Sequence, residues 1–251
     1  MNAFAISLVA FFVMLAGAMT GAVLHRILPQ SHLDDQSKDI VRLGSALIAT
    51  ISALVLGLLI TSAKNTYDLQ RNEVRQITSK LVLTDTLLER YGPQTRPARD
   101  LLRRSIPPMI TRIWGQRAVT AGGAPFAPSL EGHLLYGAIE TLTPQNEVQR
   151  TLKFQAMQTV TTVTEERILL FEQSDAGLPL PLLVVLIFWL TILLASFTLF
   201  SSLSPTGAVA LVIIALSAAG AIFLILEMNL PFDGLMQIPS APLRDALGVL
   251  G

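Results

Sequence analysis

The sequence contains no cysteine and only three histidines among its 251 residues. The absence of cysteine excludes disulfide frameworks, thiolate chemistry and cysteine-based zinc sites, and it leaves the redox compartment undetermined. His25, His32 and His133 lie apart without ligand spacing, so we expect no metal site. Charged residues are scarce at 14%, and the two signs balance at 18 each. This balance provides no global field that would attract nucleic acid, and we expect no nucleic-acid partner.

The motifs of common enzymes are missing as well. The sequence has no phosphate-binding glycine loop, no helix with paired histidines and no nucleophile elbow. We therefore expect that the protein is not an enzyme and binds no cofactor.

Apolar sequence is what the chain has in abundance. With 51% hydrophobic residues and a mean hydropathy of +0.56, it carries more apolar surface than a soluble fold can bury. Four hydrophobic segments, roughly 4–24, 43–63, 180–203 and 206–228, each match the ~20 residues that cross a hydrocarbon core. The sequence thus predicts a membrane protein with four transmembrane helices. None has an ionisable residue at its centre, which argues against a proton relay or an ion-coupled transporter.

The first segment resembles a secretory signal in one respect, because "LAGAM", Leu15 to Met19, contains a small-x-small cleavage pattern. No Lys or Arg precedes it, however, and apolar sequence continues to Leu24. We expect this segment to be retained as a transmembrane helix.

Basic residues near the segments predict the orientation. If the N-terminus is cytoplasmic, three basic residues lie outside, and a larger set lies inside: Lys64, Arg71, Arg75, Lys80, Arg167 and Arg244. The outside set is Arg26, Lys38 and Arg42. We expect a multi-pass protein of the bacterial inner membrane with both termini in the cytoplasm.

The polar region 64–178 is mostly helical by pattern. In its first part, apolar residues recur every seven positions with a second series between them, a spacing near 3.5 that predicts a packing seam. The two series are Tyr67, Val74, Leu81 and Leu88, and Gln70, Ile77, Thr84 and Tyr91. Because no helix breaker separates Lys64 from Gly92-Pro93, the second span and the seam should form one rod of ~48 residues, about 70 Å long.

Three further helices are predicted in this region. The first begins near Thr95 and covers 95–114, with Pro107-Pro108 expected to kink or end it. The glycine- and proline-rich loop "GQRAVTAGGAPFAPSL" follows, then a short helix over 131–142. Thr143-Pro144 should start a long helix that ends near Ser174 and pairs antiparallel with the first rod. Its seam should contain Val148, Leu152, Ala156, Val160, Val163 and Leu170.

These elements predict an all-α membrane protein with a helical cytoplasmic domain inserted between the second and third transmembrane helices. The expected parts are transmembrane helices 1 and 2 (1–63), the cytoplasmic domain (64–178), transmembrane helices 3 and 4 (179–230) and a cytoplasmic tail (231–251). A short helix after Ser240 should dock on a neighbour.

The second span places small and hydroxyl residues at helical spacing along one face. We call this set the small-residue face: Ala46, Thr50, Ala53, Gly57, Thr61 and Lys64. It is consistent with close helix packing, and also with copies of the helix that surround an axis and present weakly polar groups to ions or water. Lys64 is either an anchor at the membrane surface or, in a symmetric oligomer, part of a positive ring that favours anions.

Other polar features allow two interpretations each. The third span should face lipid, and Ser217 to Gly220 of the fourth should make a close helix crossing. Arginines concentrate between 90 and 117, either as a solvated face paired with glutamates or as a site that concentrates anions or lipid headgroups. They are Arg90, Arg96, Arg99, Arg103, Arg104, Arg112 and Arg117. Glu227, Asn229 and Asp233 surround Pro231 and either cap a turn or contact an ion or headgroup.

The stretches "GLLITSAKNTYDLQRNEV", "YGPQTRPARDLLR", "LEMNLPFDGL" and "PSAPLR" resemble the bestrophin-like family of bacterial membrane proteins. The resemblance covers most of the chain. It implies a four-span subunit assembled around a central pore, since bestrophins are pentameric ion channels whose second span lines the pore. Animal bestrophins bind calcium in an Asn-Pro-Phe-Gly-acidic segment. Here "NLPFDG" contains the extra Leu230 and no acidic cluster beyond Asp233, and the second span has no Phe, so neither that calcium site nor an aromatic gate is expected.

The function hypothesis is therefore a homo-oligomeric, pentameric ion channel lined by the second span. Anion preference is inferred from Lys64 and the arginine cluster. The expected partners are further copies of the chain, membrane lipids and inorganic ions. The alternative is a non-conducting membrane scaffold whose cytoplasmic helices bind a partner.

Overall fold

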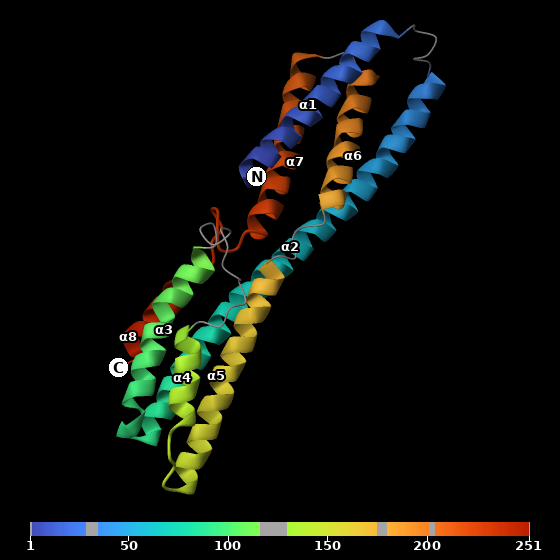
Figure 1. Cartoon of the computed structure of the whole chain (residues 1–251). Helices are drawn as coiled ribbons and strands as arrows, with labels where there is room; N and C mark the ends of the chain where they lie inside the picture. The colour runs from blue at the N-terminus through green and yellow to red at the C-terminus, as the bar shows by residue number, and fades with distance from the viewer. Residues whose placement is uncertain (1, 29–34, 116–129, 175–179, 201–203, 251) are drawn as a thin grey trace. The chain divides into compact units, whose positions relative to one another are not determined.

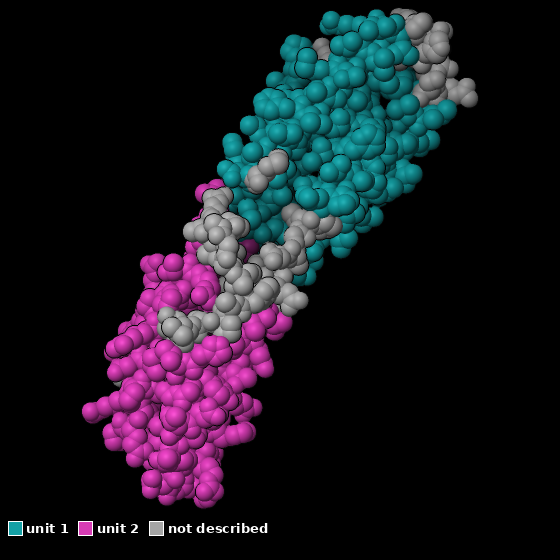
Figure 2. Space-filling view, in the orientation of Figure 1, with its two compact units in different colours: residues 1–67, 177–230 teal, residues 68–176, 231–251 magenta. Residues whose placement is uncertain are grey.

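The computed structural model describes residues 2–28, 35–115, 130–174, 180–200 and 204–250. Every regular element in these ranges is helical (Figure 1), which confirms the all-α prediction. The elements are α1 (Ala3–Ile27), α2 (Asp35–Tyr91), the 3₁₀ turn η2 (Pro93–Thr95), α3 (Arg96–Trp114), α4 (Leu130–Glu140), α5 (Glu147–Ser174), α6 (Leu180–Leu199), α7 (Pro205–Met228) and α8 (Ala241–Val249). They form two compact units (Figure 2): unit 1 holds residues 1–67 and 177–230, and unit 2 holds 68–176 and 231–251.

Four helices, α1, α2, α6 and α7, are long and apolar enough to cross a membrane. They coincide with the four predicted segments. The helix α2 runs for 57 residues without a break. The prediction of one rod from the second span to Gly92 is confirmed, and the helix begins earlier than expected, at Asp35.

In unit 1, α1 and α6 pack closely because glycine lets their backbones approach. A Cβ added to Gly17 would overlap Thr191 Cγ2, and one added to Gly21 would overlap the Ala195 carbonyl oxygen. Thr198 Oγ1 donates a hydrogen bond of 2.7 Å across this contact to the Ala18 carbonyl. Glycines four residues apart allow such approach in membranes, where packing and hydrogen bonds replace the hydrophobic effect between helices.

The third span faces outward on one side only, where Leu180, Val184 and Phe188 are exposed, and its other side is packed. Leu183, Leu186, Leu193, Leu194 and Thr198 of α6 are buried. Leu183 and Leu194 share a core with α1 and α7, and Leu186 shares another with α2 and α7. The sequence of α6 shows few polar groups, but its Thr and Ala side chains match the glycines of α1, and this pairing is visible only when both helices are considered.

The fourth span packs through one side of its small-residue cluster. Ala219 is buried in the core with α1 and α6, together with Ala215 one turn earlier. Ser217 and Gly220 are exposed, and a Cβ on Gly220 would meet open space. The crossing therefore uses Ala215 and Ala219 and not the whole cluster from Ser217 to Gly220.

In unit 2, the predicted seam of α2 is buried. Val74, Ile77, Leu81 and Leu88 are at most 3% exposed. Gln70, Thr84 and Tyr91 are buried as well, and Tyr67 is half-buried. The seven-residue repeat thus identified the packing side of this helix correctly.

The long helices α2 and α5 are antiparallel in unit 2. Lys80 forms an ion pair with Glu166, and Gln149 Nε2 donates a 3.0 Å hydrogen bond to the Tyr91 carbonyl. Residue numbers increase from 80 to 91 along α2, whereas the numbers of their contact partners on α5 decrease from 166 to 149. The antiparallel pairing predicted from the helix lengths is confirmed.

A tight turn joins α2 to α3. Gly92 has φ +128°, a conformation that favours glycine. The Thr95 hydroxyl lies 2.6 Å from the Leu88 carbonyl, so it bonds the end of α2 and does not cap α3 as expected. The helix α3 continues through Pro107 and Pro108 to Trp114, so the prolines do not end it.

Three predictions about α5 and α8 need correction. The helix α5 begins at Glu147, and the Asn146 side chain accepts a bond from the Gln149 amide, so Asn146 performs the capping expected of Thr143. Val148, predicted in the α5 seam, is 69% exposed, whereas Ala156, Val160, Val163 and Leu170 are buried. In α8, Leu243 is buried within unit 2, and the Leu250 carbonyl after it accepts a bond from Arg103 of α3. The tail helix docks on its own chain.

Candidate functional site

All six residues of the small-residue face are exposed in the single chain. Gly57 has open space on its side-chain side, since an added Cβ would meet nothing within 4 Å. At roughly 100° per residue, Ala46, Thr50, Ala53, Gly57, Thr61 and Lys64 span an arc of about 80° on α2. At its start this arc borders another part of the chain, because Ala46 lines a groove together with Phe197 and Phe200 of α6.

The opposite side of α2 packs against its own chain. Leu59 and Ala63 are each 1% exposed and form a core with Leu186 of α6 and Ile225 of α7. Ser45 and Ser52 continue this buried side toward the start of the helix. The centre of the buried side lies roughly 130° around the helix from the small-residue face. Close packing within the chain therefore does not account for the exposed face.

A third side of α2 carries large apolar residues. Leu47, Leu54 and Leu58 are 63%, 70% and 62% exposed, and Ile51 joins them. This side lies roughly 80° from the small-residue face. The helix α2 thus has three sides: one packed on its own chain, one with large apolar side chains, and one with small, weakly polar side chains. Only the small-residue face would leave open space beside the helix.

The hydroxyls of the small-residue face bond to their own helix. Thr50 Oγ1 donates to the Ala46 carbonyl and Thr61 Oγ1 to the Gly57 carbonyl, each at 2.9 Å. Because these hydroxyl groups donate their protons to carbonyl oxygens of the same helix, the lone pairs of their oxygen atoms remain available to accept hydrogen bonds from water or to contact an ion. The face is therefore weakly polar without leaving a hydroxyl donor unsatisfied.

The two cationic features predicted to affect ions, Lys64 and the arginine cluster, differ in their surroundings. Lys64 is exposed at the end of the small-residue face. In unit 2, Arg99 binds Asp85 through two hydrogen bonds of 2.7 and 2.8 Å. The hydrogen bonds that Arg99 donates to the Asp85 carboxylate raise the pKa of Arg99. Arg103 bonds the Leu250 carbonyl, and Arg96 lines a small polar cavity with these residues.

The arginine cluster therefore combines paired and exposed members. The partner of Arg99 is Asp85, not one of the glutamates expected from the sequence, and Glu147 instead pairs with Arg150. Arg117 lies outside the described residues.

The three polar residues around Pro231 have local roles. Asn229 ends α7, and its Nδ2 donates a 2.8 Å bond to the Ile225 carbonyl. Asp233 Oδ1 accepts a 3.1 Å bond from the Gly234 amide, and Glu227 is buried in the last turn of α7. These bonds are those of a helix cap and a turn. An ion or headgroup contact at Glu227, Asn229 and Asp233 stays a prediction.

Within the described ranges, no group of three or more His, Cys, Asp or Glu side chains is arranged to hold a metal. His25 Nδ1 lies 2.8 Å from the Leu199 carbonyl, where it links the ends of α1 and α6.

One feature that the sequence interpretation missed is the glycine pair Gly17 and Gly21. Its signal was present, since "GAMTG" has glycines four residues apart within an apolar segment. The same residues overlap the cleavage-like pattern "LAGAM", which offers a competing interpretation of their small side chains.

Four apolar helices and a unit of long paired helices define an all-helical membrane protein, and comparisons with known proteins identify its family. The chain belongs to the bestrophin-like family, whose domain model matches residues 8–243. This match confirms the resemblance found in the sequence.

Solved structures support the same fold. The chain is similar to a point mutant of a bacterial bestrophin homologue from Klebsiella pneumoniae, with a TM-score of 0.65, 15% identity, and 96% of this chain and 98% of that chain covered. It is also similar to a second point mutant of that homologue, with a TM-score of 0.60, 16% identity, and coverage of 96% and 97%. No protein of curated function matches the sequence.

Proposed function

We propose that the chain forms a homo-oligomeric, pentameric ion channel whose pore is lined by the small-residue face of α2. Family membership supports this proposal, because bestrophins are ion channels. The single observation that carries it is that Ala46, Thr50, Ala53, Gly57, Thr61 and Lys64 are all exposed, whereas the opposite side of the same helix is buried.

Simple geometry shows that a ring of five copies would leave a passage. Neighbouring helices pack about 8–10 Å apart, so the axes of five α2 helices would lie roughly 8 Å from the symmetry axis. Small side chains reach about 5 Å from a helix axis, which leaves a passage with a radius of roughly 3 Å. Leucines at the same positions would close it. Small residues on this face are thus what an open passage requires.

The selectivity that we propose is for anions. The hydroxyl oxygens of Thr50 and Thr61 would slightly favour cations, but they are dipoles, whereas Lys64 contributes a full charge from every copy. In a narrow passage with little screening, a ring of full charges outweighs dipoles at the same distance.

The proposed location is the bacterial inner membrane, with both termini and the segments 64–178 and 231–251 in the cytoplasm. The excess of Lys and Arg near that side of the spans supports this orientation.

Currents through planar bilayers that contain the purified protein test the proposal. We expect unitary currents whose reversal potential in a chloride gradient follows chloride. Thr50→Phe should reduce the unitary current roughly tenfold, because an aromatic ring occupies the passage. Lys64→Glu should shift the reversal potential toward that of the cation.

Leu216→Phe is the matched control, since Leu216 of α7 is 61% exposed at mid-span and takes the same ring without reaching the passage. Its currents should equal those of the wild type. Silent bilayers from an intact particle would contradict the channel and favour the alternative, a non-conducting scaffold whose helices bind a partner.

A further inference from the structure

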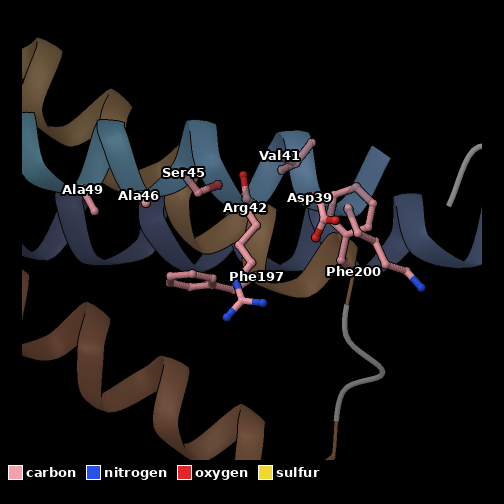
Figure 3. Close-up of a pocket in the computed structure, with 10 residues that line it drawn as sticks. Asp39, Val41, Arg42, Ser45, Ala46, Ala49, Phe197 and Phe200 are labelled. Carbon is pink, nitrogen blue, oxygen red and sulfur yellow. The ribbon is translucent and has the colours of Figure 1, made fainter. Parts of the chain in front are cut away.

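A groove opens between α2 and the end of α6 in unit 1, beside Ser45 at the edge of the packed side of α2 (Figure 3). Its volume is about 710 Å³. The lining residues are Lys38, Asp39, Val41, Arg42, Ser45, Ala46 and Ala49 of α2, with Ser196, Phe197 and Phe200 at the end of α6. A groove of this size would hold a long hydrocarbon chain or a bulky side chain.

The groove changes character along its length. Lys38, Asp39 and Arg42 lie at one end, so two cationic side chains meet one carboxylate there. Toward Ala49 the lining on α2 becomes small and apolar, and Phe197 and Phe200 face it from α6. In Figure 3 the Arg42 side chain extends across the groove toward Phe197.

The depth of each end follows from the sequence of α2. Its apolar segment begins at Leu43, so Lys38 and Arg42 come immediately before the hydrocarbon, at the level of the phospholipid headgroups. Ala49 lies two turns further along, beside the hydrocarbon. The charged end therefore meets headgroups, and the apolar end meets acyl chains.

We propose that this groove binds one anionic phospholipid, with its phosphate between Lys38 and Arg42 and one acyl chain against Ala49 and Phe197. Cationic pockets between membrane helices are suited to such headgroups. An apolar helix from a second copy would also fill the volume, but it would bring the charged end formed by Lys38, Asp39 and Arg42 out of contact with water and headgroups, which is costly. The proposal does not depend on ion conduction.

Native mass spectrometry of the intact particle, titrated with phosphatidylglycerol or phosphatidylcholine of equal chain length, tests it. We expect the wild type to retain phosphatidylglycerol about tenfold better. The double variant Lys38→Gln/Arg42→Gln should retain both lipids equally. Arg26→Gln, which removes an exposed cation at the end of α1 outside this groove, should behave as the wild type.

A second variant tests the apolar end. Ala49→Phe fills the groove, so the particle should assemble normally but lose the bound phosphatidylglycerol. Equal retention of the two lipids by the wild type would overturn the proposal. Failure of Ala49→Phe to assemble, together with unchanged lipid retention by Lys38→Gln/Arg42→Gln, would assign the groove to a second copy and also overturn it.

Discussion

At the scale of single residues, the ion pair between Asp85 and Arg99 is the polar contact with the clearest energetic consequence. Both side chains are largely buried, at 10% and 20% exposure, and the guanidinium binds the carboxylate through two nitrogens. By contrast, Glu147 and Arg150 form a pair that is 80% and 70% exposed. Burial, and not the number of charges, decides how much each pair matters.

Asp85→Asn should lower the free energy of unfolding of the protein by about 2 kcal/mol, because it leaves the Arg99 charge largely buried without its counter-charge. Thermal unfolding in detergent measures the effect. Glu147→Gln is the control and should change stability by less than about 0.5 kcal/mol. Equal effects of the two substitutions would show that the buried ion pair contributes no more to the free energy of unfolding than the exposed one.

At the scale of the helices, the crossing of α1 and α6 depends on the absence of side chains. A Cβ at Gly21 would overlap Thr198 Oγ1 as well as the Ala195 carbonyl, and neither backbone has room to retreat without opening the core. The bond from Thr198 to the Ala18 carbonyl lies in the same contact.

Gly21→Ala should therefore destabilise the protein by about 1–3 kcal/mol, since the helices must separate to admit the methyl group. Gly220→Ala adds the same methyl to α7 where nothing lies within 4 Å, and it should leave stability unchanged or raise it by up to about 1 kcal/mol, because alanine favours a helix more than glycine does. Thermal unfolding of both variants in the same detergent makes the comparison. If Gly21→Ala unfolded at the same temperature as the wild type, the helices α1 and α6 would have room for the methyl group, and the proposed close contact would be contradicted.

The sequence predicted the helices well and their contacts less well. Periodicity located the seam from Val74 to Tyr91, because one helix displays its own packing side. It also placed the small-residue face, although whether that face is exposed depends on α6 and α7. The burial of α6 was missed for the same reason. Contacts between segments far apart in sequence, such as Gly21 with Ala195, leave no periodic signal in either segment alone.

At the scale of the whole molecule, one chain cannot form the passage that we propose. The small-residue face is exposed along its length and is flanked by the bulky apolar side of Leu47, Leu54 and Leu58. In a ring of copies, the bulky sides can pack on neighbours or lipid, while the small sides face the axis. Assembly would thereby place the Lys64 charges around one opening.

The most direct measurement is single-particle imaging of the full chain in lipid nanodiscs, at a resolution that traces α2. The account predicts five-fold symmetry and an open passage on the axis, with Thr50, Gly57 and Thr61 of every copy around it. A particle in which these residues face protein or lipid, with no passage on the axis, would contradict it.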